Sequence, residues 1–178
     1  MSGFVVWFTG LSGAGKTTVA NIVEAELEQR GLVVDHLDGD IVRTHLSKGL
    51  GFSKEDRDIN IHRIAWVASR VARAGAAVIV SAISPYEEAR QHARSLIAPH
   101  VPFIEVHVAT PLDECARRDP KGLYAAAFAG EIADFTGVSA PYEEPSDPEV
   151  RIDTTGVSPS ESAQAVLDRI EQLVGARA

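Results

Sequence analysis

The segment Gly10-Leu-Ser-Gly-Ala-Gly-Lys-Thr17 constrains this chain more than any other feature of its sequence. It matches the pattern G-x-x-x-x-G-K-[ST], and it lies between an apolar run, Phe4 to Thr9, and an amphipathic stretch, Lys16 to Arg30. A strand, a glycine-rich turn and a helix in this order form a phosphate-binding loop. The segment therefore predicts a parallel sheet covered by helices, with a nucleotide phosphate at the end of the first strand.

Each residue type in this loop has a physical role in binding ATP and magnesium. Glycines let backbone N–H groups turn toward phosphate oxygens. Lys16, expected to be a solvent-facing loop charge, can reach the β- and γ-phosphates, and the Thr17 hydroxyl can coordinate Mg²⁺. The ATP-binding residues predicted here are Gly10, Leu11, Ser12, Gly13, Ala14, Gly15, Lys16, Thr17 and Thr18.

Short apolar runs alternate with amphipathic stretches along the rest of the chain. Further strands are expected at Leu32–Leu37, Ala77–Ile83, Phe103–Val108 and Val150–Asp153, and helices at Lys16–Arg30, from Asp40 to near Lys48, after Ser53 and at the C-terminus. Nearly continuous apolar runs are typical of parallel strands covered on both faces. We predict one domain over residues 1–178, an α/β three-layer sandwich of the P-loop NTPase type with a doubly wound sheet.

Three segments share one pattern for the start of a helix: Ser84-Pro-Tyr-Glu87, Thr110-Pro-Leu-Asp113 and Ser158-Pro-Ser-Glu161. Each has a capping hydroxyl, a proline at the first helical position and an acid at the third. Ser53 and Asp56 form a capping-box pattern as well. We therefore predict that a helix begins at each of these sites.

Residues 118–149 interrupt the alternation of strands and helices, because they show little sustained periodicity. A long irregular insert in a compact domain is often a lid or a binding loop that excludes water. The alternative is a surface loop without a role. We predict a lid insertion at this position.

Composition excludes several classes of function. The net charge of −8 argues against broad nucleic-acid binding, although a few cations gathered in one cleft can still bind an anion. The single cysteine, Cys115, cannot form an internal disulfide, and the six histidines lack the spacing of a metal site. The N-terminus resembles neither a signal peptide nor a membrane helix, so we expect a cytoplasmic protein without membrane contact.

An acidic pair, Asp38 and Asp40, follows the second predicted strand. A carboxylate there points into the crevice where α/β sheets bind ligands, and Asp38 could hold a magnesium-bound water or accept a hydroxyl proton. Asp40 could instead only cap the next helix. A GTPase is not favoured, because the DxxG match at Asp153-Thr-Thr-Gly156 lies near the C-terminus and no NKxD follows it.

Several blocks together closely resemble one family, adenosine 5′-phosphosulfate kinase. They are GLSGAGKTT, LDGD followed by VR, GLGFSKEDRDIN, VSAISPY, RDPKGLY, GEIADFTGV and APYEEP, and they cover nearly the whole chain. The resemblance implies transfer of the ATP γ-phosphate to the 3′-hydroxyl of adenosine 5′-phosphosulfate, with magnesium. It also implies a functional link to a separate sulfurylase, since the chain is expected to be the kinase part alone, and it leaves a homodimer open.

The resemblance assigns the acceptor site to specific positions. An arginine fork suits phosphate and sulfate oxygens, and Arg57 and Asn60 are three apart, so they share a helix face. Phe52 and Phe135 look like an aromatic pair that sandwiches the adenine; core packing is the alternative for both. The predicted substrate-binding residues are Asp40, Arg43, Phe52, Arg57, Asn60, Ile83, Ser84 and Phe135, and Arg118 and Lys121 are predicted to cover ATP.

The predicted catalytic residues are Lys16, Asp38 and Ser84, and the predicted metal ligands are Thr17 and Asp38. The family is described as having a phosphoserine at the position of Ser84. We predict that Ser84 lines the acceptor site without being an obligatory phosphate carrier, because the local sequence supplies no base to activate it.

The sequence departs from the family pattern at a few positions. Ile41 stands where asparagine is usual, and Ala125, Ala126 and Phe128 replace mostly basic residues, which puts those lid charges in doubt. Two other interpretations are retained: a P-loop kinase for another small metabolite, and a catalytically silent nucleotide-binding protein. The phenylalanine pair and the Arg57 face argue against the first, and Lys16, Thr17 and Asp38 argue against the second.

Overall fold

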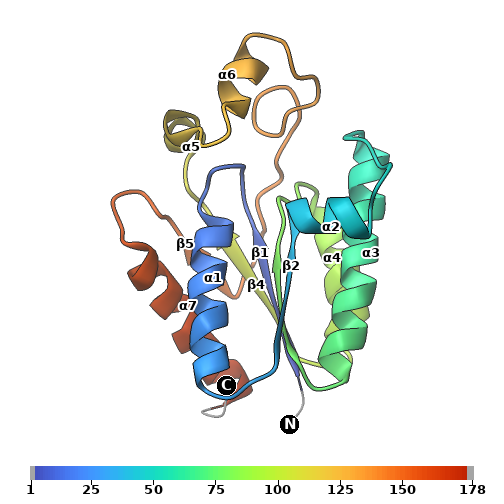
Figure 1. Ribbon diagram of the computed structural model, residues 1–178, viewed down its shortest axis with the longest axis vertical. Helices are drawn as coiled ribbons and strands as arrows, with labels where there is room; N and C mark the ends of the chain where they lie inside the picture. The colour runs from blue at the N-terminus through green and yellow to red at the C-terminus, as the bar shows by residue number, and fades with distance from the viewer. Residues whose placement is uncertain (1–2, 176–178) are drawn as a thin grey trace.

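The computed structural model describes residues 3–175, and its centre is a parallel five-stranded sheet with the strand order β2-β3-β1-β4-β5 (Figure 1). The strands are β1 (Phe4–Thr9), β2 (Val34–Asp38), β3 (Ala77–Ser81), β4 (Phe103–Val108) and β5 (Val150–Ile152). The helices are α1 (Lys16–Gln29), α2 (Gly39–His45), α3 (Lys54–Arg73), α4 (Glu87–Ile97), α5 (Leu112–Arg118), α6 (Leu123–Phe128) and α7 (Pro159–Val174). The predicted doubly wound α/β fold is confirmed.

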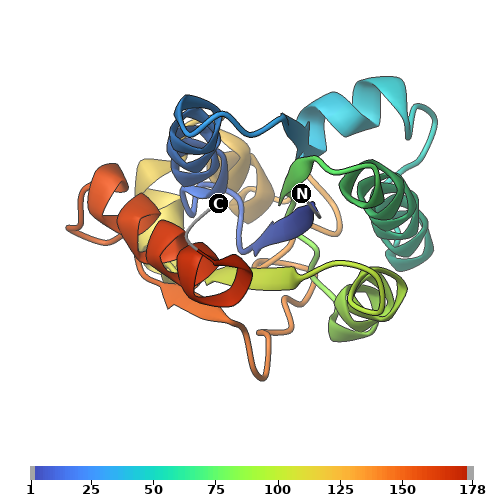
Figure 2. The same cartoon turned by 90° about the horizontal axis from the view of Figure 1, so that it is seen from below.

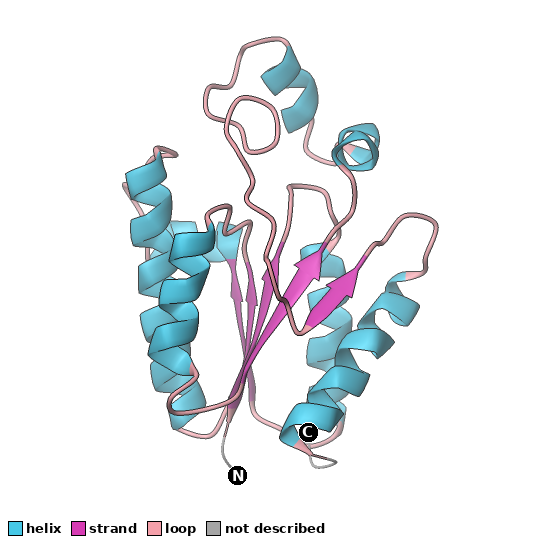
Figure 3. Ribbon diagram, turned by 180° about the vertical axis from the view of Figure 1, so that it is seen from behind, coloured by secondary structure: helices cyan, strands magenta, loops and turns pink. Residues whose placement is uncertain are grey.

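Two layers of helices enclose the sheet (Figures 2 and 3). Helices α1 and α7 cover one face and α3 and α4 the other, and alternate residues of β1 point to the two sides. Val6 and Phe8 belong to the core under α1 and α7, whereas Val5 and Trp7 belong to the core under α3 and α4. All six residues of β1 are buried, which is why this strand reads as one apolar run.

Two of the four predicted helix starts are confirmed. Ser53 accepts a hydrogen bond from Asp56 N at 3.1 Å at the start of α3. At the start of α7, Ser158 and Glu161 form a complete capping box. Both sites are exposed helix ends, where a hydroxyl has the freedom to turn back onto its own backbone.

The predicted caps at Ser84 and Thr110 are wrong. Helix α4 begins only at Glu87, whose N–H donates to the Glu143 carboxylate at 2.7 Å, and α5 begins at Leu112. The Ser84 Oγ accepts instead from Trp7 Nε1 at 3.1 Å, and the Thr110 hydroxyl donates to Ala14 O at 3.0 Å. Both hydroxyls are buried, so distant partners of the tertiary fold satisfy them in place of the helix.

The insertion of residues 118–149 lies above the carboxyl edge of the sheet and contains the short helix α6, which the sequence analysis did not predict (Figure 1). Asp119 holds its first turn, because the Asp119 carboxylate accepts from the N–H groups of Tyr124 and Ala125 at 3.0 Å each. Among the described residues, no helix combines the length and the apolar character needed to cross a membrane.

Candidate active site

A cavity of about 570 Å³ opens at the carboxyl edge of the sheet. The glycine-rich loop closes one end of it, α2 and α3 supply the other, the turn after β3 forms the floor, and the insertion covers the top. The predicted site residues that line it are Ser12, Gly13, Gly15, Lys16, Thr17, Thr18, Asp38, Asp40, Arg43, Phe52, Arg57, Asn60, Ile83, Ser84, Arg118, Lys121 and Phe135. The structure thus brings residues from most of the chain to one place.

Lys16 lies at the end of the cavity that the glycine-rich loop closes, called here the phosphate end after its predicted ligand. The lysine is only 9% exposed, so the expectation of a solvent-facing charge is wrong. Its Nζ donates to Gly10 O at 3.0 Å and to Leu11 O at 2.7 Å, because the loop curls around it. Burial lowers the Lys16 pKa to about 8. A partly desolvated ammonium held by neutral carbonyls is well suited to attract a phosphate.

Three predicted ATP-binding residues, Gly10, Leu11 and Ala14, do not line the cavity but shape the loop. A Cβ at Gly10 would lie 2.5 Å from Val108 O, so this position requires glycine. The Gly10 and Leu11 carbonyls hold Lys16, as above. Ala14 is fully buried, and its carbonyl accepts from Thr154 Oγ1 at 2.8 Å.

Thr17 and Asp38, the two residues predicted as magnesium ligands, lie within hydrogen-bond distance of each other. The Thr17 hydroxyl donates to Asp38 Oδ2 at 2.9 Å, and Ser81 donates to the same oxygen at 3.0 Å. Asp38, and not Asp40, caps α2, because its Oδ1 accepts from Asp40 N at 2.9 Å. Burial pushes the pKa of Asp38 upward, but these hydrogen bonds outweigh it and hold the pKa below its ordinary value. Asp38 is therefore an anion at neutral pH and a suitable oxygen ligand for Mg²⁺.

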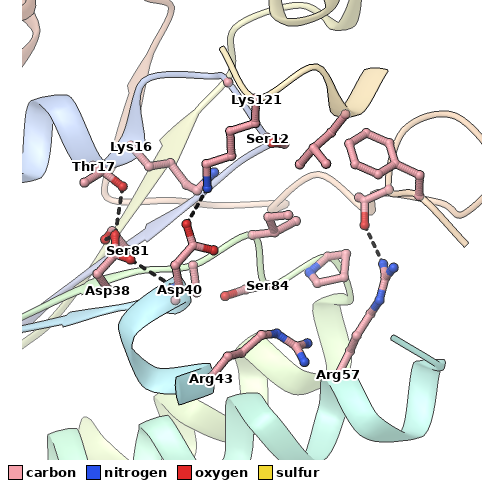
Figure 4. Close-up of a pocket in the computed structure, with 18 of the residues that line it drawn as sticks. Ser12, Lys16, Thr17, Asp38, Asp40, Arg43, Arg57, Ser81, Ser84 and Lys121 are labelled. Atoms are coloured by element: carbon pink, nitrogen blue, oxygen red, sulfur yellow. Dashed lines mark hydrogen bonds and ion pairs between the residues drawn. The ribbon is translucent and has the colours of Figure 1, made fainter. Parts of the chain in front are cut away.

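Arg43 and Arg57 lie at the opposite end of the cavity from Lys16, with Ser84 between the two ends (Figure 4). Burial and the nearby Arg57 charge both lower the pKa of Arg43, so two cations share this end. Arg57 is 8% exposed and donates to Thr136 Oγ1 and to Asp134 O in the insertion. Asn60 is also buried, and no donor within the described residues reaches its Oδ1. Two crowded cations and an unused acceptor indicate a site built for an anionic, hydrogen-bonding ligand.

The aromatic pair is present but has further contacts. Phe52 is 60% exposed and lies under the Arg43 guanidinium, whose carbon is 4.3 Å from the ring centre. Phe135 packs edge-on against Tyr124, with ring centres 5.0 Å apart. Both rings line the cavity, so neither is purely a core residue.

The two cations at the start of the insertion are engaged differently. Arg118 donates to Thr154 Oγ1 at 2.8 Å and to Glu114 Oε1 at 2.8 Å, so protein groups hold its guanidinium at the cavity wall. Lys121 pairs with the Asp40 carboxylate across the cavity, as the dashed line in Figure 4 shows. This ion pair links the insertion to α2. Both of its side chains are more than half exposed, so it contributes little to stability.

Comparison with known proteins agrees with this geometry. The adenylylsulphate kinase family model matches residues 2–153. The adenylyl-sulfate kinase of Picosynechococcus is 52% identical over 171 residues, which is 96% of this chain and 95% of that protein. The chain belongs to the adenylylsulphate kinase family.

Two further family members show how the chain relates to larger and to solved proteins. A probable bifunctional SAT/APS kinase of Sorangium cellulosum is 55% identical over 97% of this chain, which spans only 29% of that protein's length. The structure of the Mycobacterium tuberculosis APS kinase CysC in complex with AMPPNP and APS has a TM-score of 0.92 and 48% identity, covering 96% of this chain and 98% of that chain.

Some residues of the candidate site in this member of the adenylylsulphate kinase family were missed by sequence reasoning. Ser81 holds Asp38, Thr136 holds Arg57, and Trp7 holds Ser84. Ser81 ends β3 within an apolar run, so a polar residue at a strand's carboxyl end was the available signal. The contacts of Trp7 and Thr136 span 77 and 79 residues of sequence, and no local pattern marks them.

Proposed function

We propose that this chain transfers the γ-phosphate of ATP to the 3′-hydroxyl of adenosine 5′-phosphosulfate, giving 3′-phosphoadenosine 5′-phosphosulfate and ADP. The main support is one cavity that joins the glycine-rich loop to the Arg43, Arg57 and Asn60 cluster. A relative with 48% identity has been solved with an ATP analogue and APS bound together. A site with anion-binding groups at both ends matches a reaction between two anionic nucleotides.

In this proposal the phosphate end positions ATP and stabilises charge. The loop N–H groups and Lys16 bind the phosphates, and Arg118 and Lys121 lie where they can cover the nucleotide. Thr17 and Asp38 would hold Mg²⁺, since a hydroxyl and a carboxylate are hard oxygen ligands. Bound Mg²⁺ supplies charge neutralisation at the phosphates. The lowered pKa makes Asp38 a weak proton acceptor, so we favour the metal role over the base role.

At the other end, Arg43 and Arg57 would bind the phosphosulfate, and Asn60 would use its free Oδ1. Phe52 and Phe135 would contact the adenine, and Asp40, Ile83 and Ser84 would line the path to the reacting hydroxyl. We propose no phosphate-carrying role for Ser84. Its Oγ already accepts from Trp7, and within the described residues no basic side chain hydrogen-bonds to it.

The test is a panel of acceptors offered to the purified protein with ATP and magnesium. We expect ADP and a 3′-phosphorylated product in equal amounts with adenosine 5′-phosphosulfate, and none with its 3′-deoxy analogue. ADP formation with a sugar acid or a nucleoside, and none with adenosine 5′-phosphosulfate, would reject the proposal. Tight ATP binding without turnover on any acceptor would instead indicate a silent nucleotide-binding protein. Localisation in the cytoplasm and operation beside a separate sulfurylase belong to the same proposal.

A further inference from the structure

The turn that carries Ser84 has an unusual backbone. Ser84 has φ +48°, a left-handed conformation that residues with a Cβ rarely adopt, and it is 1% exposed. Such a conformation persists only where the surroundings hold it firmly, and it is often found at functional sites. Since Ile83, Ser84 and Pro85 form the floor of the cavity, the groups that hold this turn also set the shape of the site.

A buried arginine that the mechanism above does not use holds the turn from below. Arg90 of α4 is 1% exposed, and its Nη1 donates to Ser84 O at 2.6 Å. On the other side of the turn, Thr9 Oγ1 donates to Ile83 O at 2.7 Å and Trp7 Nε1 donates to Ser84 Oγ. The Arg90 bond is charge-assisted, which makes it the strongest of these contacts.

The same guanidinium also binds the returning end of the insertion. Arg90 Nη2 donates to Glu143 O at 2.6 Å. Glu143 in turn donates its N–H to Pro85 O at 2.8 Å, and its carboxylate accepts from Glu87 N. The insertion is therefore docked directly on the Ser84 turn, with one arginine bonded to both.

The charge of Arg90 is balanced by a buried carboxylate. Arg90 Nε lies 3.1 Å from Oε1 of Glu105 on β4, which is 2% exposed. Glu105 also pairs with Arg94 Nη2 at 3.2 Å. Burying charges is costly, so an ion pair here is not explained by stability alone. Arg90 Nη2 also pairs with the Glu87 carboxylate. An arginine at this position has one specific capacity, which is to reach two carbonyls and two carboxylates with one planar fork.

We propose that Arg90 is a positioning residue for the acceptor half of the site. It holds the Ser84 turn and the insertion end at Glu143 in one fixed relation, and so it sets the place of Phe135 and Thr136 relative to Ser84. This role of Arg90 rests on the proposed function in one respect only, which is that the acceptor in the kinetic test is adenosine 5′-phosphosulfate. Arg90 touches neither substrate in this scheme and acts through Ser84 and the insertion.

The kinetic test compares Arg90→Lys with Arg94→Lys. Both replacements keep a cation beside Glu105, but Arg94 contacts Glu149 and neither Ser84 nor Glu143. We expect Arg90→Lys to lower kcat/KM for the acceptor by roughly ten- to hundredfold, as small misplacements do, with the KM for ATP nearly unchanged. Arg94→Lys should leave both parameters near wild type. The proposal would be overturned if both variants lowered the acceptor kcat/KM equally. It would also be overturned if Arg90→Lys lowered kcat/KM equally for the acceptor and for ATP.

A spectroscopic test reads the turn without any substrate. The chain has two tryptophans, and Trp66 is exposed, so Trp66→Phe leaves only Trp7, whose indole N–H bonds to Ser84 Oγ. In this background Arg90→Lys should shift the Trp7 emission, and Arg94→Lys should not. This readout also separates the two proposals: a shift in a protein inactive on adenosine 5′-phosphosulfate would reject only the proposed function. Unchanged emission in Arg90→Lys would overturn the positioning role.

If Arg90→Lys does not fold, Arg90→Gln combined with Glu105→Gln provides the same test. This pair removes both charges together, so it leaves no unpaired partner from the Arg90–Glu105 contact, and glutamine is too short to span the two carbonyls. The expected result is again selective loss of acceptor kcat/KM with a shifted Trp7 emission. A folded double variant with wild-type kinetics and emission would overturn the proposal.

Discussion

The two ends of the cavity are built in different ways. At the phosphate end, Lys16 is held by carbonyls five and six residues away in sequence, within one turn of loop. At the acceptor end, Arg57 is held by residues 77 and 79 positions away, and Lys121 reaches Asp40 across 81 positions. The lysine at the phosphate end is therefore held by its own loop, although Thr110 and Thr154 anchor that loop through Ala14 O. The cation at the acceptor end is held only once the insertion has docked beside α3.

The largest expected effect comes from breaking the phosphate end alone. Lys16→Ala should lower the rate by a hundred- to thousandfold or more, on the order of the loss seen when one charge-stabilising group is removed. The acceptor KM should change little. Stability should also change little, because the variant loses two hydrogen bonds but no longer buries an ammonium.

The measurements for this variant are steady-state kinetics and thermal melting, with Lys54→Ala as control. Lys54 is a largely exposed lysine paired with Asp58, so its replacement should leave both readings near wild type. A Lys16→Ala protein with normal melting and a near-normal rate would show that the phosphate end has been assigned to the wrong lysine.

The next effect isolates the acceptor end. Arg57→Ala should raise the KM for adenosine 5′-phosphosulfate by roughly ten- to hundredfold, since a charge-assisted bond to an anion is worth about 1.5–3 kcal/mol. The KM for ATP should move far less. Arg63→Ala on the same helix is the matched control, because the one hydrogen bond that the Arg63 side chain makes within residues 3–175 goes to Leu46 O on an exposed face. If the KM values for both substrates rose equally, the assignment of Arg57 to the acceptor end would be wrong.

The contrast between local and distant contacts explains how much could be predicted from the sequence. The strand–loop–helix start of the chain predicted β1, the phosphate loop and the sheet type, because these depend on neighbours in sequence. Arg43, Arg57 and Asn60 were found through resemblance to a family, not through spacing alone. Resemblance gave their identity but not the hydrogen bonds that hold them.

The failures have two physical origins, distant partners for the hydroxyl groups and unrecognised local backbone geometry for Lys16 and α6. Ser84 and Thr110 have the pattern of caps, but buried long-range partners take their hydroxyl groups, as found for Trp7 and Ala14. Lys16 was expected in solvent because a loop charge usually is, and the curled backbone of its own loop buries it. Helix α6 was missed because Asp119, five residues before Tyr124, is a distant capping signal.

A smaller effect is expected from Ser84→Ala, which tests the floor between the two ends. The variant loses a hydrogen bond to the acceptor and leaves the Trp7 N–H without its partner, at about 1 kcal/mol each. The rate should therefore fall by tens-fold at most. The opposite result has three signs: inactivity like that of Lys16→Ala, ping-pong kinetics in the wild type, and a labelled serine after incubation with radiolabelled ATP alone. Any two of them would make Ser84 a phosphate carrier.

The smallest expected effect is a pH dependence of the unfolding free energy, and it comes from His107 of β4 where it packs against Tyr142 of the insertion. His107 of β4 is 2% exposed and stacks on Tyr142, with ring centres 5.9 Å apart. Tyr142 OH lies 2.9 Å from Thr9 Oγ1, which holds the Ser84 turn. Burial lowers the pKa of His107 to about 4, although the Glu144 charge opposes the shift. His107 is therefore neutral in the folded protein at pH values where the unfolded chain is protonated.

The sign of the pH dependence follows from this difference. Between the unfolded pKa of about 6.5 and the folded pKa of about 4, the unfolded state binds the extra proton, so stability falls as the pH falls. From pH 7 to pH 5 the contribution of His107 to the unfolding free energy should drop by about 2 kcal/mol. Denaturant unfolding of wild type, His107→Gln and the exposed-site control His100→Gln at both pH values measures it. The loss should be smaller by about this amount only in His107→Gln, because His62, whose pKa burial also lowers, keeps its own contribution in all three proteins. If the unfolding free energy of all three proteins falls by the same amount between pH 7 and pH 5, the prediction for His107 is wrong and other groups cause the pH dependence.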